Sequence, residues 1–264
     1  GLPQATIYCI TQDKHGYLWL GTDGGGLCRF DGVNFKTYTK KDGFDADVVR
    51  ALLYDSKGRL WAGTQDKGII MYDGIKFHTI GKKNGLTAKN VLCITENKDG
   101  DIWAGTDDNG VNKITILASD NKKDSFLVQV IDESKGLSNN SVFNIHHDKD
   151  GHLWLATFGG INIVTPITSD TTEKDKKKEK EFLFQIEHLR GGIEIPTDYI
   201  LSVAEDAEGA LWFGTLEGSI FRIAPSKKQK TGIQNFKLNV LSRKVSSFNQ
   251  SNGFNAKKIW DILL

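Results

Sequence analysis

The segment around residues 146–152 is the first place where side-chain types and spacing suggest chemistry. His146, His147 and His152 form the only histidine cluster of the chain. His147 and His152 flank the stretch 148–151 and are expected to face each other across a hairpin. A structural zinc site needs four ligands and a catalytic one needs three, and the sequence offers no evident third ligand here. We therefore predict surface or edge histidines and no metal site.

The acidic turns are the second place to consider. Asp148-Lys-Asp-Gly151 opens like a calcium-binding loop but lacks the third acidic position and the distal Glu. Asp23-Gly-Gly-Gly26 follows an expected strand but enters another strand, so it lacks the helix N-terminus that phosphate binding uses. Hairpin closure explains both motifs. With no catalytic triad, carboxylate pair or nucleotide fingerprint in a persuasive context, the sequence predicts no catalysis and no cofactor.

These turns belong to a repeat that organises the whole chain. Its core has a Trp followed two residues later by Gly or Ala and then Thr, and it occurs at 16–22, 58–64, 100–106, 151–157 and 209–215. The Trp residues are Trp19, Trp61, Trp103, Trp154 and Trp212, so the spacings are 42, 42, 51 and 58 residues. Residues that recur in every unit serve packing, which we expect of the Trp residues. The Thr is expected to bond the turn that follows it.

Each repeat unit is predicted to contain four short strands, A to D. In the first unit these are 7–12, 17–22, 27–31 and 34–39, and a longer crossover at 40–47 leads to the next strand A at 48–54. Three tight hairpins and one crossover every 40–50 residues are typical of a β-propeller blade. The fold class is therefore all-β. No segment shows a sustained helical period.

The predicted domain organisation is a single partial propeller over residues 1–264. The blades cover about 1–42, 43–84, 85–135, 136–191 and 192–252, and 253–264 starts the next one. This makes five complete blades and the first strand of a sixth. Three insertions, 121–124, 173–181 and 226–230, fall between strands C and D of blades 3, 4 and 5. The run at 173–181 is interpreted as a solvated loop, with partner docking as the alternative.

Composition excludes several classes of protein. The chain has 34 basic and 33 acidic residues and a formal net charge of +1, so it lacks the basic excess of a nucleic-acid binder or a polybasic membrane-surface protein. Its apolar runs are shorter than the ~18 residues that a membrane span needs. Cys9, Cys28 and Cys93 are odd in number and lie in apolar runs, which favours buried thiols over a disulfide framework.

Candidate ligand-binding residues are those that differ between units. When the units are aligned, two positions where the crossover enters strand A vary between units, while the residues beside them stay apolar. The turns between strands B and C reach the same face. Aromatic faces beside Asn, Asp and Arg suit a sugar, because rings stack on rings and polar groups bond hydroxyls. The predicted site comprises Tyr8, Arg50, Phe143, Trp260, Asp23, Asp66, Asp107 and Asn109.

Residues 1–31 closely resemble the two-component regulator propeller repeat, through Gly1-Leu-Pro-Gln4, the Leu18-Trp-Leu-Gly-Thr22 core and Gly26-Leu-Cys-Arg-Phe-Asp31. The resemblance extends over essentially the whole chain. Departures are Ala156, which replaces the core Gly in blade 4, and the missing Arg-Phe-Asp-Gly ending in blades 4 and 5. The resemblance implies a seven-bladed parent that is the periplasmic sensor portion of a hybrid histidine kinase and response regulator, with further sensor domains and one membrane span.

The function expected from this resemblance is sensing of an oligosaccharide or glycan fragment, without catalysis by this segment. Expected partners are a small soluble ligand and the remaining parts of the parent, with no nucleic acid, and a homodimer is left open. One alternative is a non-enzymatic scaffold for dimerisation or protein docking. The other is an enzyme similar to streptogramin lyases, which would need a catalytic His on the channel face, whereas His146, His147 and His152 lie toward the opposite face.

Overall fold

The computed structural model describes residues 1–86, 88–117, 125–167, 183–224, 244–254 and 256–262. They form two compact units: unit 1 contains residues 1–135 and 139–145, and unit 2 contains 136–138 and 146–264. No helix in the described part of the chain is long and apolar enough to cross a membrane. The predicted insertions 121–124, 173–181 and 226–230 lie outside the described residues.

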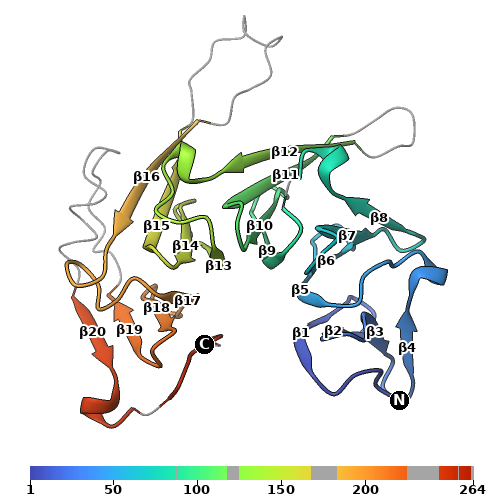
Figure 1. Cartoon of the computed structure of the whole chain (residues 1–264), viewed down its shortest axis with the longest axis horizontal. Coiled ribbons are helices and arrows are strands. Elements are labelled where there is room, and N and C mark those ends of the chain that lie inside the picture. The colour runs from blue at the N-terminus through green and yellow to red at the C-terminus, as the bar shows by residue number, and fades with distance from the viewer. Residues whose placement is uncertain (87, 118–124, 168–182, 225–243, 255, 263–264) are drawn as a thin grey trace, which may run out of the picture. The chain divides into compact units, whose positions relative to one another are not determined.

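Unit 1 consists of short antiparallel strands in three sheets (Figure 1). The strands are β1 (Ile7–Gln12), β2 (Leu18–Thr22), β3 (Leu27–Phe30), β4 (Phe35–Tyr38), β5 (Val49–Tyr54), β6 (Leu60–Thr64), β7 (Ile69–Tyr72), β8 (Phe77–Ile80), β9 (Val91–Glu96), β10 (Ile102–Thr106), β11 (Val111–Leu117) and β12 (Ser125–Ile131). Short 3-10 helices follow the fourth strand of each sheet: η1 (Lys40–Asp42), η2 (Lys82–Asn84) and η3 (Glu133–Lys135).

Two further sheets follow. Their strands are β13 (Val142–His147), β14 (Leu153–Thr157), β15 (Gly160–Pro166), β16 (Phe184–Leu189), β17 (Ile200–Glu205), β18 (Leu211–Thr215), β19 (Ile220–Ile223) and β20 (Val245–Phe248), with the 3-10 helix η6 (Gln250–Asn252) after β20. The boundary between the two units falls within β13, after Ile145.

Every sheet has four strands in sequence order, such as β1-β2-β3-β4 and β5-β6-β7-β8. This is the arrangement of a propeller blade, so the predicted all-β fold of four-stranded blades is confirmed. The predicted strand A at 7–12 matches β1, and the other strands of the first blade agree to within one residue at each end. The predicted first strand of the sixth blade differs from the structure. Residues 256–262 form no strand, although the Ile259 amide donates to the Thr215 carbonyl at 3.0 Å. A single hydrogen bond does not make a strand, which needs a ladder of backbone hydrogen bonds to its neighbour.

The hairpin between strands A and B is closed by one carboxylate. In blade 2, Asp55 Oδ1 accepts from the backbone amides of Lys57 and Arg59 at 3.0 and 2.8 Å. Its Oδ2 accepts from Trp61 Nε1 at 2.8 Å and from Arg59 Nε at 2.6 Å. Gly58 has φ +82°, which L side chains rarely adopt. The Asp therefore fixes both the turn and the Trp that leaves it.

This hydrogen bond from Trp to Asp recurs in four of the five blades. The distances from Nε1 to Oδ2 are 2.8 Å for Trp19–Asp13, 2.8 Å for Trp61–Asp55, 2.9 Å for Trp154–Asp148 and 2.8 Å for Trp212–Asp206. Blade 3 has Asn97 at this position, and its Oδ1 accepts from the amides of Asp99 and Asp101 at 3.0 and 2.8 Å. The turn contacts survive that substitution because an amide oxygen also accepts.

The Trp residues pack between successive blades. Trp19 belongs to a buried cluster with Leu60, Ala62 and Ile70 of the next blade. In unit 2, Trp154 packs in the same way with Phe213 and other residues of blade 5. A Trp buries on the order of 200 Å², so these side chains supply much of the core. The predicted packing role is confirmed for them.

The core Gly of the repeat gives the next blade room to approach. A Cβ on Gly21 would lie 2.4 Å from Cys9 Sγ and 2.7 Å from Val49 Cγ1. Blade 4 has the fully buried Ala156 at this position. The three cysteines are free, as expected, and burial raises the pKa of the Cys9 and Cys93 thiols to about 12.

The Thr at the end of strand B bonds the following turn, as predicted. Its hydroxyl donates to a Gly carbonyl at 2.8–2.9 Å in Thr22–Gly26, Thr64–Gly68, Thr106–Gly110 and Thr157–Gly160. In blade 5, the Thr215 hydroxyl instead accepts from the Ser219 amide at 2.9 Å.

A buried Asn on strand C has different surroundings in two blades. In blade 4, Asn162 Oδ1 accepts from the Ser138 amide at 2.8 Å, and its Nδ2 donates to Ser138 Oγ at 2.7 Å and Thr157 Oγ1 at 3.2 Å. Asn112 holds the same register in blade 3 and is equally buried. Neither polar atom of its side chain has a hydrogen-bond partner in the described structure. Blade 2 has Ile70 at this position.

We predict that Asp55→Ala lowers the free energy of unfolding by about 3–5 kcal/mol, because it leaves Arg59 and Trp61 Nε1 buried without their acceptor. Asp55→Asn is the comparison variant and should cost less than Asp55→Ala, since its amide oxygen can still accept from the two turn amides as Asn97 does in blade 3, although its NH2 group cannot accept from Arg59 or Trp61 Nε1. Urea denaturation followed by Trp fluorescence measures both. Negligible losses in both variants would show that the carboxylate does not hold the turn.

For the buried Asn, Asn112→Ile is expected to raise the free energy of unfolding by about 1–2 kcal/mol, because it replaces an unpartnered amide with the residue that blade 2 uses. Asn162→Ile should lower it by about 2–4 kcal/mol, because Ser138 and Thr157 lose their partner. Thermal and urea unfolding of both variants test this pair. The interpretation is wrong if the two substitutions have effects of the same sign.

Candidate functional site

The start of strand A and the turn between strands B and C meet at one end of each blade, which we call the entry end. Backbone amides just after the repeat Thr donate to carbonyls just before strand A: Asp23 to Thr6, Gln65 to Val48, Asp107 to Asn90 and Leu216 to Tyr199, at 3.0–3.2 Å. The same turns reach the next crossover, as the Gly26 and Gly68 amides do to the Asp47 and Lys89 carbonyls. The variable residues at the start of strand A and those of the turn between strands B and C therefore lie at one end of the blade, as predicted.

Side chains from these two places also contact each other within a blade. Arg50 Nη2 donates to Gln65 Oε1 at 2.9 Å in blade 2, and Asn90 Nδ2 donates to Asp107 Oδ2 at 3.0 Å in blade 3. In blade 1, a side-chain hydrogen bond to Asp23 is the largest cause that raises the pKa of Tyr8 above its ordinary value. The variable residues thus form pairs that hold one another in position.

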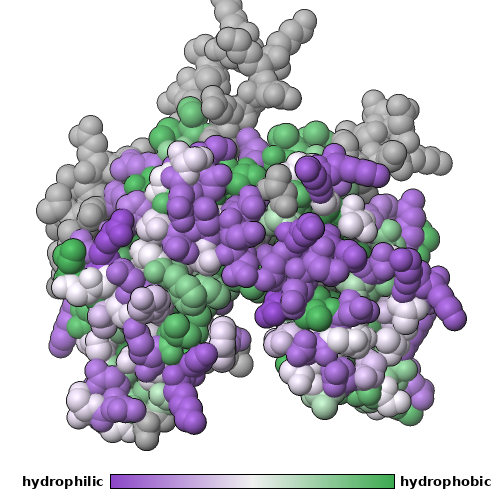
Figure 2. Space-filling view, viewed as in Figure 1, coloured by the Kyte–Doolittle hydropathy of each residue, from purple (hydrophilic) through white to green (hydrophobic). Residues whose placement is uncertain are grey.

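Three of the predicted site residues form one cluster in unit 1. The Arg50 guanidinium lies over the Tyr8 ring, with 5.1 Å between Cζ and the ring centroid, and so joins blades 2 and 1. Tyr8 remains 43% exposed, and Asp23 is near enough to raise its pKa. We call Tyr8, Asp23, Arg50 and Gln65 the Arg50 cluster. The visible surface over β5 and β9 is predominantly hydrophilic (Figure 2).

The other predicted residues lie apart from this cluster or have other partners. Asp66 forms an ion pair with Lys67 at 3.1 Å, and the Asn109 amide donates to Thr106 Oγ1 at 3.0 Å. The Asp107 carbonyl accepts from the Ser141 hydroxyl. Half-buried Phe143 is the second residue of β13.

Trp260 belongs to unit 2 and is 62% exposed, with Lys258 Nζ 5.5 Å from its ring. The sequence prediction left out Gln65, which aligns with Asp23 and Asp107, and it left out Asn90 and Ser141, which stand in the variable position two residues before the one that it chose.

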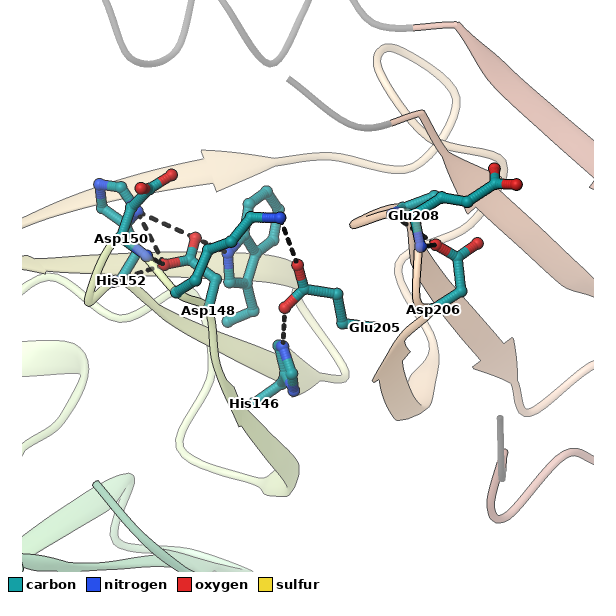
Figure 3. Close-up of polar contacts among 10 residues, drawn as sticks. His146, Asp148, Asp150, His152, Glu205, Asp206 and Glu208 are labelled. Carbon is teal, nitrogen blue, oxygen red and sulfur yellow. Dashed lines mark hydrogen bonds and ion pairs between the residues drawn. The ribbon is translucent and has the colours of Figure 1, made fainter. Parts of the chain in front are cut away.

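The opposite end of each blade, at the hairpin between strands A and B, is called the hairpin end. In unit 2, it carries the histidines (Figure 3). His152 Nδ1 binds Asp148 at 2.9 Å, and His146 Nε2 binds Glu205 at 2.9 Å. The rings of His152 and His146 thus each bind a carboxylate, which the expected pairing of His147 with His152 did not predict. Within the described residues, no group of three His, Cys, Asp or Glu side chains could hold a metal ion.

Burial and hydrogen bonds shift two pKa values at this end. Burial alone would raise the pKa of Asp148, but hydrogen bonds from His152 and Trp154 outweigh it and lower the value to about 2. Burial lowers the pKa of His147 to about 4, and the neighbouring His146 charge acts in the same direction. His147 is therefore neutral at pH 7.

A family model described as "Two component regulator propeller" matches five segments, residues 1–24, 43–66, 85–108, 136–159 and 194–217. Each segment contains a crossover and strands A and B of one blade. The chain carries five two-component regulator propeller repeats. The matched segments include every predicted site residue except Asn109 and Trp260.

Solved structures with the same fold include proteins of several kinds. The extracellular domain of the putative hybrid two component system BT3049 from B. thetaiotaomicron matches with a TM-score of 0.67 and 20% identity, over 95% of this chain and 30% of that chain. PorZ, a surface component of the type-IX secretion system of Porphyromonas gingivalis, matches with 0.65 and 15%, over 95% and 34%. Virginiamycin B lyase from Staphylococcus aureus matches with 0.59 and 16%, over 92% and 69%.

These identities show a shared fold alone. No curated protein matches the sequence. This chain spans less than a third of the length of the BT3049 extracellular domain.

The hairpin end predicts a pH dependence. A buried His whose pKa lies near 4, below its ordinary 6.5, leaves stability intact above pH 6.5 and reduces it as the pH falls toward 4, because the unfolded chain takes up the proton first. The loss is at most about 3 kcal/mol.

His147→Gln should flatten this fall in the free energy of unfolding between pH 6.5 and 4.5, and exposed His15→Gln should not. Urea denaturation at pH 7, 5.5 and 4.5 measures both. An unchanged slope in His147→Gln would contradict the assignment.

Proposed function

We propose that this chain is the ligand-sensing extracellular propeller segment of a hybrid two-component sensor histidine kinase and response regulator, and that it responds to an oligosaccharide or glycan fragment. The five matched repeats carry this proposal. The structural match to the extracellular domain of a putative hybrid two component system supports it. A periplasmic location and further blades and sensor domains in the parent protein belong to the same proposal.

The entry end is the face that we assign to the ligand. It holds an exposed Tyr beside amide, carboxylate and guanidinium groups in the Arg50 cluster, and Asn90 with Asp107 in the next blade. Such groups suit a saccharide, whose ring faces stack on aromatic residues and whose hydroxyls need directional hydrogen bonds. Contacts that hold the side chains in place before binding reduce the entropy lost when a ligand binds.

The segment is proposed to be non-catalytic. The histidines that an enzyme would need as acid or base lie at the hairpin end, and His146 and His152 are held by Glu205 and Asp148. The likeness to virginiamycin B lyase at 16% identity is one of fold. Binding alone transmits a signal only if the ligand prefers one of two arrangements of the parent protein.

We predict that Arg50→Ala and Phe143→Ala each weaken ligand binding by tenfold or more while the melting temperature stays nearly unchanged. A panel of oligosaccharides screened by thermal shift identifies the ligand first, because a ligand at 100 times its Kd stabilises the folded state by about 2.7 kcal/mol. Calorimetry then compares the variants.

Trp103→Ala is the contrasting variant, because its buried packing predicts a loss of stability before any loss of binding. Deleting 173–181 should leave binding intact. The wrong face has been chosen if that deletion abolishes binding while Arg50→Ala and Phe143→Ala have no effect. No shift with any ligand, together with strong self-association, would favour the scaffold.

A further inference from the structure

Arg50 differs from Arg59 and Arg222 in what holds it. Arg59 lies 2.6 Å from the Asp55 carboxylate, and Arg222 lies 3.5 Å from Asp206 and 3.4 Å from Glu208. Both belong to the hairpin end, where a turn carboxylate neutralises the guanidinium. In the described part of the chain, Arg50 has no carboxylate within ion-pair distance. The described structure therefore leaves this guanidinium without a direct ion pair.

Neutral groups hold this guanidinium in position. Gln65 Oε1 accepts from Nη2 at 2.9 Å, and the Tyr8 ring lies below Cζ at 5.1 Å. Arg50 Nε is buried and has no acceptor among the described residues. A guanidinium presents its donors in a rigid planar fork, so a side chain fixed by two neighbours already has the geometry that binds a carboxylate or sulfate through two parallel hydrogen bonds.

The nearby acidic side chains have other partners. Asp23 interacts with the Tyr8 hydroxyl and raises its pKa, and Asp66 is paired with Lys67 at 3.1 Å. Neither forms an ion pair with Arg50. An anion brought by a ligand would therefore meet the guanidinium without first displacing a carboxylate, and the exposed fraction of Tyr8 leaves the cluster open to solvent.

We propose that Arg50 binds an anionic group on the ligand, so that the saccharide sensed at the entry end is an acidic one that carries carboxylate or sulfate. This inference rests on the proposed function and names the chemical class of its ligand. Gln65 and Tyr8 act as positioning residues that orient the guanidinium. Arg suits this role better than Lys, because the ammonium group of Lys lacks the planar fork.

Calorimetry on the 264-residue chain with matched probes tests this proposal. An oligogalacturonate is compared with its methyl ester, which removes the charge and keeps the shape, and a sulfated galactan oligosaccharide is compared with its desulfated form. We expect at least one acidic probe to bind tenfold or more tightly than its neutral counterpart. The two arms distinguish carboxylate from sulfate.

Variants then assign the preference to Arg50. Arg50→Gln should remove the preference for the acidic probe, and Arg50→Lys should retain part of it. Arg29→Gln is the matched control, because Arg29 also lies over aromatic rings, Tyr17 and Trp19, and is expected to leave the preference unchanged. Melting temperatures confirm that each variant is folded.

The outcomes separate this inference from the proposed function. Neutral probes that bind as tightly as acidic ones, or an acidic preference that survives Arg50→Gln, overturn the role of Arg50 and leave saccharide sensing in place. A panel in which no saccharide binds overturns saccharide sensing itself, and the acidic ligand with it.

Discussion

The hydrogen bond from Trp Nε1 to the turn Asp is the contact on which the blades depend. One carboxylate closes the hairpin through two backbone amides and holds the indole that packs against the next blade, so local turn geometry and interblade packing share a single side chain. Without that acceptor, the indole N–H would be buried unpaired. The same bond in four blades explains why Asp and Trp recur six residues apart while most of the residues between them vary.

Because the framework is anchored at the hairpin end, the entry end is free to differ between blades. There, backbone amide bonds tie the turn to the start of strand A whatever the side chains are. Side chains at these positions carry no packing duty common to all blades, and they have diversified into pairs such as Arg50 with Gln65 and Asn90 with Asp107. The turn is held by backbone atoms at the entry end and by the Asp side chain at the hairpin end, so only the entry end can change its side chains without losing these contacts.

The repeat spacing predicted the four-stranded blades, and the strand limits predicted for the first blade agree to within one residue, because turn Gly and Asp residues mark its hairpins in the sequence. The Trp-to-Asp bond was not predicted, since the turn Asp already had a sufficient role in closing the hairpin. The variable site positions were predicted, but their pairing was not. The Arg50–Gln65 contact joins residues fifteen apart across two strands and depends on side-chain conformation, which periodicity does not encode. The sequence also could not predict that Asn112 has no hydrogen-bond partner among the described residues, since Asn162 is the same residue type in the same register and has partners.

A group that repeats in every blade cannot identify a ligand, because it offers the same contact several times around the fold. Selectivity must come from a side chain that occurs once and is held in one geometry. Arg50 satisfies both conditions, and its contact with Tyr8 places it across two blades. A ligand bound there would touch blades 1 and 2 together, and its affinity would depend on how those blades are packed. Binding energy at such a position favours one packing over another, which is the requirement for a sensor.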